Sequence, residues 1–284
     1  MLEHLTQAMY YFNVHLLYAT IVAFAAWALT AVLPASATTK YWIWVATSLN
    51  FFVPLGALFN KLFAPHLHWA QPLGAIGDFA LRVSHGAMAQ LISAVWLLGT
   101  SLMLARLALR LRAERKLQSA GPAVDGLLHP RISLPIGIGE LLSESELNAV
   151  LIHEQAHARR RDNLIRLAHE LAQCALWFHP LIWMTGRRLA LYRELSCDES
   201  VMERARGRDL VSALAKLAEP VADKFVLQAS ATSHLSHRLA RLEAAPWRPR
   251  FAANALLVAI FWALLAAGIF ATVAHTACCF VAKA

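Results

Sequence analysis

The residues best suited to chemistry are His153-Glu-Gln-Ala-His157. Side chains four positions apart lie on one face of a helix, one turn apart, so two imidazoles in this arrangement can bind one zinc ion. The glutamate that follows the first histidine is then placed to take a proton from a zinc-bound water. The pattern predicts zinc ligands His153 and His157, with Glu154 as catalytic base. The alternative is a solvated, charged helix that carries two histidines by chance.

The segment around this motif has the pattern of a helix. Ser143, followed three residues later by Glu146, is typical of a capping box at a helix N-terminus. Apolar residues then continue at helical spacing: Leu147, Val150, Leu151 and Ala158. No proline or glycine interrupts the run before Pro180. The motif is therefore expected on an uninterrupted helix, as zinc binding requires.

A catalytic zinc usually has three protein ligands and one open position. Glu194 and Asp198 lie four residues apart in Leu191–Ser200, a second segment without helix breakers. Glu194 can complete the ligand set, and Asp198 can accept a hydrogen bond from a ligand imidazole. The alternative, two surface acids beside Arg193 and Arg204, stays open on these residues alone.

Other polar residues near the motif are weaker candidates. His179 stands in an apolar, aromatic stretch and is expected to pack at a turn, while Cys197 is expected to be a small buried residue. His169 and Glu170 lie about three helical turns beyond the motif, too far to reach the same ion. Candidates for stabilising an oxyanion, or simply for a basic helix face, are His234, His237 and Arg238.

The order and spacing of several short pieces resemble the BlaR/MecR-type membrane zinc peptidases, from Pro135 to about Val201. The matching pieces are Ile132-Ser-Leu-Pro135, Glu146-Leu147, His153–His157, Arg161-Asp-Asn-Leu164, Trp177-Phe-His-Pro180 and Arg193-Glu-Leu-Ser-Cys-Asp-Glu199. The resemblance implies a mainly α, gluzincin-like peptidase with zinc ligands His153, His157 and Glu194 and with Glu154 as base. A similar Glu-x-x-x-Asp element occurs in the CAAX-prenyl-protease and heat-shock membrane peptidases. The sensor-transducers continue into a penicillin-binding domain, which is not expected in this chain.

Four apolar segments are long enough to cross a bilayer, which needs ~20 residues: Tyr10–Leu33, Tyr41–Phe59, Gly86–Leu109 and Phe251–Val273. Any one of them could be a buried core helix, but four such segments between polar stretches favour a polytopic membrane protein. The first lacks the basic start of a cleavable signal peptide and is expected to be an uncleaved anchor. We therefore predict a membrane region over 1–110, a zinc peptidase domain over 111–250, and a last span with a short tail over 251–284.

Charge predicts the orientation. Basic residues flank the third and fourth segments: Arg106, Arg110, Arg112, Arg115, Lys116, Arg248 and Arg250. Such flanks favour the cytoplasmic side of a plasma or inner membrane, which places 111–250 inside, both termini outside, Ala35–Lys40 inside and Asn60–His85 outside. The net charge of +8 does not indicate nucleic-acid binding, because the basic runs lack interleaved aromatic residues and suit anionic lipid.

The four cysteines have no metal-binding spacing. Cys174 and Cys197 are expected to be reduced in the cytoplasm. Cys278-Cys279 is interpreted as a chance apolar pair, with lipid attachment or an intermolecular disulfide as alternatives. Gln118–Gly126 is expected to be a turn-rich linker, and Arg131–Pro135 a short edge strand that can hold an extended substrate.

The sequence thus predicts an integral-membrane zinc endopeptidase. The resemblance implies a protein substrate: a cytoplasmic transcriptional repressor, the chain itself or a membrane polypeptide. The expected partners are this substrate and membrane lipid, with a second copy of the chain left open and no direct nucleic acid. The rival functions are a metal-binding signalling adaptor without proteolytic activity, a quality-control protease for membrane proteins, and a transporter component. Two polar residues within the spans, His15 and Asn50, are too few to outline a transport pathway.

Overall fold

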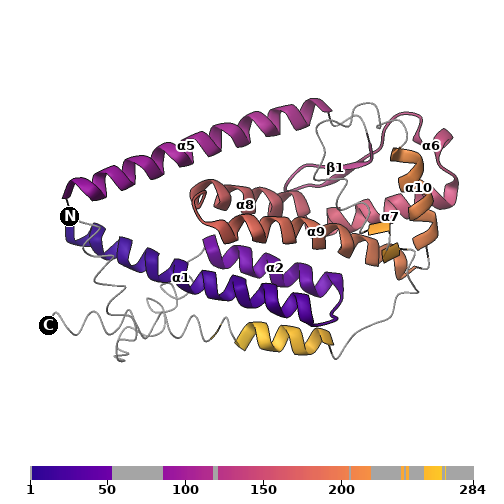
Figure 1. The fold of residues 1–284 in the computed structure, drawn as a ribbon. Coiled ribbons are helices and arrows are strands. Elements are labelled where there is room, and N and C mark those ends of the chain that lie inside the picture. The colour runs from indigo at the N-terminus through magenta and orange to yellow at the C-terminus, as the bar shows by residue number, and fades with distance from the viewer. Residues whose placement is uncertain are drawn as a thin grey trace.

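The computed structural model describes residues 2–52, 86–117, 121–204, 206–218, 238–239, 241–242, 253–263 and 266. The described chain is mainly helical, as predicted, with one small sheet (Figure 1). Its elements are α1 (Leu2–Val32), α2 (Ala37–Phe52), α5 (Gly86–Leu117), β1 (Ala123–Asp125), β2 (Arg131–Ser133), α6 (Ile138–Leu141), α7 (Glu144–Arg160), α8 (Asp162–Ala175), α9 (Pro180–Met202) and α10 (Gly207–Ala218).

Two of the described helices contain stretches long and apolar enough to cross a membrane, His15–Val32 in α1 and Gln90–Glu114 in α5. The second predicted span is described only as far as Phe52, and its remainder lies outside the described residues. The fourth is represented by a shorter apolar helix, Ala253–Ala263. The structure is thus consistent with a membrane protein, and the number of spans stays a prediction.

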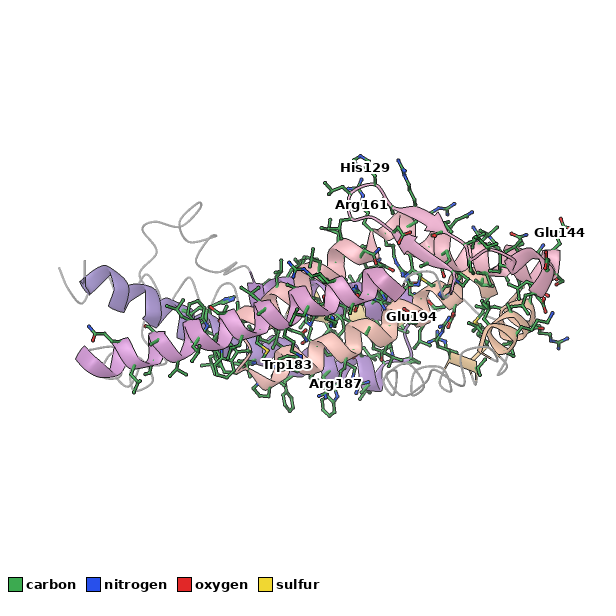
Figure 2. The ribbon with its side chains drawn as sticks, turned by 90° about the horizontal axis from the view of Figure 1, so that it is seen from above. His129, Glu144, Arg161, Trp183, Arg187 and Glu194 are labelled. Carbon is green, nitrogen blue, oxygen red and sulfur yellow. The ribbon has the colours of Figure 1, made fainter. Side chains whose placement is uncertain are left out.

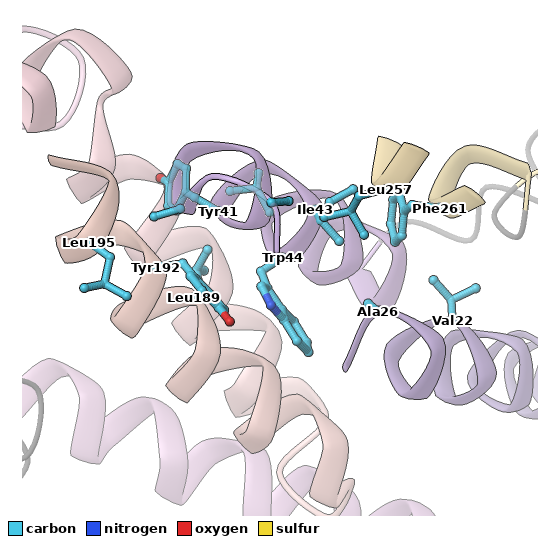
Figure 3. Packing of buried hydrophobic residues seen from close by; sticks show 13 residues of the cluster. Val22, Ala26, Tyr41, Ile43, Trp44, Leu189, Tyr192, Leu195, Leu257 and Phe261 are labelled. Atoms are coloured by element: carbon cyan, nitrogen blue, oxygen red, sulfur yellow. The ribbon is translucent and has the colours of Figure 1, made fainter. Parts of the chain in front are cut away.

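Helix α9 lies at the centre of the molecule, packed along α2 with α1 beside it (Figure 1). The largest side chains in their shared core are Trp44 and Tyr41 of α2, both fully buried, and Figure 3 shows them between α9 and the N-terminal helices. Leu257 and Phe261 close the same cluster from the C-terminal helix. Residues from the predicted membrane region and from the predicted peptidase domain therefore share one core.

The connection between α1 and α2 is fixed to α9 by a buried carboxylate. Glu199 accepts hydrogen bonds from the backbone N–H groups of Ala37, at 2.7 Å, and Thr38, at 2.9 Å. Asn254 accepts another from the N–H of Ser36 at 2.8 Å. The first N–H groups of a helix have no partner within the helix. Glu199 and Asn254 supply those partners, so the start of α2 is held by segments far away in the sequence.

The predicted capping box at the start of α7 is confirmed. The Ser143 hydroxyl accepts from the Glu146 N–H at 3.4 Å, and the Glu146 carboxylate accepts from the Ser143 N–H at 2.7 Å. The prediction of an uninterrupted helix from Ser143 to Pro180 is wrong. Arg161 adopts a left-handed conformation with φ 55°, which ends α7 and starts α8. A second break follows Ala175, and Pro180 opens α9 at a position where its missing N–H costs nothing.

The predicted strand near Arg131–Pro135 is confirmed as β2, which pairs antiparallel with β1. β1 lies within Gln118–Gly126, the segment predicted to be only a turn-rich linker. Its three residues are extended because they pair with β2 and because the Asn163 side chain donates a hydrogen bond to the Val124 carbonyl at 2.6 Å. β2 follows β1 after a loop of five residues, whereas Asn163 lies 39 residues away on α8. The turn-rich composition of Gln118–Gly126 predicted neither contact.

Candidate metal centre

Helices α7 and α9 bring three potential metal-ligand atoms together. The Nε2 atoms of His153 and His157 lie 3.2 Å apart. Glu194 Oε2 lies 3.7 Å from the first and 3.8 Å from the second. Ligand atoms bound tetrahedrally at about 2.0–2.2 Å from one zinc ion are roughly 3.3–3.6 Å from each other. The three atoms therefore fit one zinc ion with small adjustments. Figure 2 labels Glu194 on α9.

The other ring nitrogen of each histidine faces a carboxylate. His157 Nδ1 lies 2.6 Å from Asp162 Oδ2, and His153 Nδ1 lies 3.2 Å from Asp198 Oδ1. A carboxylate at Nδ1 fixes the ring and leaves Nε2 free for a metal. Asp198 lies where the sequence predicted it, with only 1% of its side chain exposed, so the alternative of a surface acid is wrong. Asp162 was not among the predicted site residues.

Helical spacing did not predict Asp162 as a site residue, because the helix ends at Arg161. On a continuous helix, a residue five positions after His157 is rotated by about 140° from it and faces elsewhere. The left-handed turn brings Asp162 back toward the imidazole. No proline or glycine near Arg161 indicates that a helix ends there. Only the resemblance to Arg161-Asp-Asn-Leu164 of the peptidase family marked this residue.

Asp162 is itself held by two further side chains. It accepts hydrogen bonds from Tyr41 Oη at 2.6 Å and from Arg160 Nη2 at 2.6 Å. The Arg160 guanidinium packs 4.5 Å from the centre of the Tyr41 ring and donates to Ser196 Oγ at 2.6 Å. Tyr41 belongs to α2, Arg160 to α7 and Ser196 to α9. The orientation of His157 thus depends on contacts among four helices.

Arg238 reaches the same centre from the C-terminal part of the domain. Its Nε and Nη2 atoms donate to the two Asp198 carboxylate oxygens at 2.9 and 2.8 Å, a bidentate pair. Its Nη1 lies 3.4 Å from Glu194 Oε2. Of the three predicted oxyanion candidates, Arg238 therefore lies at the site, whereas His234 and His237 lie outside the described residues.

The electrostatics of the centre favour an added positive charge. Burial alone would raise the pKa values of Glu194 and Asp198, but Arg193, His153 and Arg238 outweigh it and hold both carboxyls ionised, with pKa values below the usual range. Burial lowers the pKa of His153, yet the neighbouring carboxylates of Asp198 and Glu194 outweigh that effect and raise it to about 9. A site that stabilises a proton on His153 this strongly also suits a metal cation at Nε2.

Cys197 lies close to the histidines as well: its Sγ and one ring nitrogen of each histidine are all within 4.8 Å of one another. A cysteine binds metal as its thiolate. Burial raises the pKa of the Cys197 thiol, and Arg160 Nη2 lies 2.8 Å from the sulfur. The structure confirms Cys197 as a small, fully buried residue.

The remaining predicted residues lie as follows. Glu154 lies on α7 directly after His153 and is partly exposed. His169 pairs with Ser48, with Nδ1 and Oγ 2.7 Å apart, and lies away from the centre as predicted. His179 precedes α9 at a turn and packs against Phe51, which confirms its predicted packing role.

Residues 115–242 match the family model described as BlaR1 peptidase M56, and the match includes every residue of the candidate centre except Tyr41. This segment is a BlaR/MecR-type peptidase domain. The BlaR/MecR-type domain is 35% identical over 82 residues to regulatory protein BlaR1 of Bacillus licheniformis. It is 24% identical over 82 residues to the methicillin resistance mecR1 protein of Staphylococcus aureus. Each alignment covers 29% of this chain and 14% of the relative. No solved structure matches the chain significantly.

Proposed function

We propose that this chain is a multi-pass membrane zinc endopeptidase. The observation that carries the proposal is the convergence of His153 Nε2, His157 Nε2 and Glu194 Oε2 within 3.8 Å, with a carboxylate behind each imidazole. Three protein ligands with an open fourth position are typical of catalytic rather than structural zinc. Asp198 and Asp162 orient the two imidazoles.

The chemistry proposed is hydrolysis of a peptide bond. Zinc bound at this centre would polarise the scissile carbonyl and lower the pKa of a water molecule. Glu154 then takes the proton of the attacking water and later delivers it to the leaving amine. Arg238 Nη1 is the candidate donor to negative charge that develops on the carbonyl oxygen. Strand β2 offers an edge on which an extended substrate can pair.

The substrate proposed is a protein in a regulatory pathway. The relatives are named a regulatory protein and a methicillin resistance protein. We propose a cytoplasmic repressor or the chain itself as substrate, cleaved by a catalytic domain on the cytoplasmic side of the plasma or inner membrane. A quality-control protease for membrane proteins is the alternative within the same chemistry.

The rival from another class is a signalling adaptor that keeps a metal only for structure. A structural zinc site is closed by four protein ligands and needs no base. Here three ligand atoms of suitable kind converge, and Glu154 follows the first of them. These features favour the enzyme.

Purified protein with Glu154→Gln tests the proposal. The amide is nearly isosteric but cannot accept a proton, so zinc content should stay at the wild-type level while cleavage falls roughly 10²–10⁴-fold. Cleavage is measured on the chain itself and on candidate repressors. Undiminished cleavage by Glu154→Gln would overturn the mechanism.

Two further variants identify the third ligand in the same preparations. Glu194→Ala should lose tight zinc binding and Cys197→Ala should keep it, because the Glu194 carboxylate oxygen lies within 3.8 Å of both histidine Nε2 atoms. The reverse result would transfer the ligand role from Glu194 to Cys197.

A further inference from the structure

The turn between α8 and α9 exposes large apolar side chains at the end of the hairpin. Leu171 is 41% exposed, Phe178 46% and Trp183 37%. Figure 2 shows Trp183 on the outer side of α9. A soluble protein rarely exposes such a group of side chains without a partner. The surroundings of the turn indicate what that partner is.

On one side the turn contacts the middle of α5. Trp96 Nε1 donates a hydrogen bond to the Ala175 carbonyl at 2.8 Å, and the Trp177 ring packs directly on Gly99. Both α5 residues lie within the stretch long enough to span a bilayer, Gln90–Glu114, in which only Leu107 is buried in the protein. Its exposed apolar residues at this level include Val95, Leu97, Leu98 and Leu102. The apolar surface of the turn is thus continuous with that of α5.

On the other side the turn contacts the interior of the α1–α2 pair. His179 Nε2 lies 2.9 Å from Thr20 Oγ1, and Leu176 packs with Leu16 and Phe51. Thr20 is twelve residues before the end of α1, so the turn lies roughly 18 Å from that end along the helix. If α1 and α5 cross a bilayer, the turn between α8 and α9 lies within it.

The first charges beyond the turn lie at the same distance from it on α5 and on α9. On α8 the nearest charge is the buried Glu170, five residues before Ala175 and paired with Arg110 of α5. On α5 the first charged residue after Gly99 is Arg106, seven positions later. On α9 the first after Pro180 is Arg187, also seven positions later and also exposed. Seven helical residues rise ~10 Å. On each helix, therefore, an uncharged segment ~10 Å long separates the turn from an exposed arginine.

The backbone of the turn is also adapted to a medium without water. Hydrocarbon cannot hydrogen-bond to carbonyl groups, so irregular backbone at membrane depth needs partners from the protein. The Ala175 carbonyl receives the Trp96 indole N–H, and the Trp177 carbonyl receives that of Trp183 at 3.0 Å. Two large apolar side chains therefore supply the donors that water would supply at a soluble surface.

We propose that the α8–α9 turn is inserted into the hydrocarbon of the membrane, where lipid acyl chains contact Leu171, Phe178 and Trp183. The inference rests on the membrane location given under the proposed function. It divides the predicted cytoplasmic block 111–250: the metal centre faces the cytoplasm while this hairpin end lies in lipid beside α5 and α1. The peptidase domain is then attached to the membrane by its own fold as well as by the flanking spans.

Spin labels on the full chain in lipid nanodiscs test the insertion. Cys278→Ser and Cys279→Ser remove the tail cysteines, and Cys174 and Cys197 are buried. A single nitroxide is then attached at Phe178→Cys, with Leu98→Cys as the reference on α5 and Glu144→Cys as the reference on the far end of the domain. Collisions with oxygen, which concentrates in lipid, are compared with collisions with a water-soluble nickel chelate. We expect a positive depth parameter at positions 178 and 98 and a negative one at 144.

The reference label at position 98 separates the proposed insertion of the turn from the proposed membrane location of the chain. A negative value at 178 with a positive value at 98 would overturn the insertion and leave the membrane protease intact. Negative values at both positions would overturn the membrane location as well. Trp183→Cys provides a second probe of the turn if Phe178→Cys does not fold, and the same positive sign is expected there. Zinc content of each labelled chain reports whether its fold is preserved.

Discussion

At the scale of single residues, the two motif histidines differ in how their second ring nitrogen is held. His157 Nδ1 makes a hydrogen bond of 2.6 Å with Asp162 Oδ2, whereas His153 Nδ1 lies 3.2 Å from Asp198 Oδ1 without hydrogen-bond geometry. Asp162 is fixed further by Tyr41 and by Arg160. Since a carboxylate behind an imidazole orients the ligand and raises its basicity, Asp162 should matter for metal binding at least as much as Asp198.

Asp162→Asn tests this ranking. The amide keeps the size of the side chain but loses the charge that holds the imidazole, so zinc affinity should fall about 10–100-fold. The measurement is competition for zinc against a chelator of known affinity. Asp209→Asn is the matched control, because Asp209, at the start of α10, pairs with Arg206 and not with a residue of the candidate centre. Equal affinities for Asp162→Asn and Asp209→Asn would show that Asp162 does not orient His157.

The residues that the sequence predicted are those whose roles follow from helical spacing. His153 and His157 share a face of α7, and Glu194 and Asp198 share a face of α9, because each pair is four positions apart. Asp162 and Tyr41 reach the centre through a helix break and through tertiary packing, and neither leaves a periodic signal. Helical spacing therefore predicted the proposed ligands and Asp198, but it did not predict Asp162 and Tyr41, which support His157.

At the scale of elements, the helix ends were predictable where local chemistry fixes them. The capping box at Ser143 and the proline at position 180 set the starts of α7 and α9. The break at Arg161 is set by tertiary contacts instead: Arg160 and Asp162, on either side of it, bind each other and residues of α2 and α9. Those contacts compensate the cost of a left-handed arginine, which is of order 1–3 kcal/mol.

Helix α2 takes part in the metal centre through one hydroxyl, and Tyr41→Phe isolates it. The variant keeps the ring that packs against Arg160 and removes only the hydrogen bond to Asp162. A buried hydrogen bond of this kind contributes about 1–3 kcal/mol, so a several-fold to 100-fold loss of zinc affinity is expected. The chelator competition described for Asp162 measures it.

Tyr192→Phe is the control for this variant. Tyr192 is similarly buried, on α9, and its ring faces Lys40 rather than the metal centre. Zinc affinity should be unchanged in Tyr192→Phe. If both variants lost zinc affinity equally, the effect would reflect loosening of the helix core and not the link from Tyr41 to His157.

At the scale of the whole molecule, α9 runs from the turn that we propose to be inserted in the membrane to the candidate metal centre. Fourteen residues separate Pro180 at the turn from Glu194 at the centre, a rise of roughly 21 Å. With the turn ~10 Å below the arginines of α5 and α9, the proposed insertion places the centre about 10 Å above them, near the headgroups. A protease held there would meet polypeptide segments close to the membrane surface first.

The basic residues around the third and fourth segments predict that the catalytic side faces the cytoplasm. Cysteine labelling with an impermeant maleimide on spheroplasts tests it. In the wild-type chain Cys278 and Cys279 should react in intact spheroplasts, because the C-terminal tail is predicted to lie outside. Cys174 and Cys197 are buried and should not contribute to the labelling. After both tail cysteines are replaced by serine, Glu144→Cys should react only when the membrane is opened, because Glu144 is exposed on the catalytic side. Reaction of Glu144→Cys in intact spheroplasts would invert the topology and move the substrate from cytoplasmic regulators to exported proteins. The zinc chemistry would be unaffected by that outcome, because the contacts among α7, α8 and α9 do not depend on which side of the membrane they face.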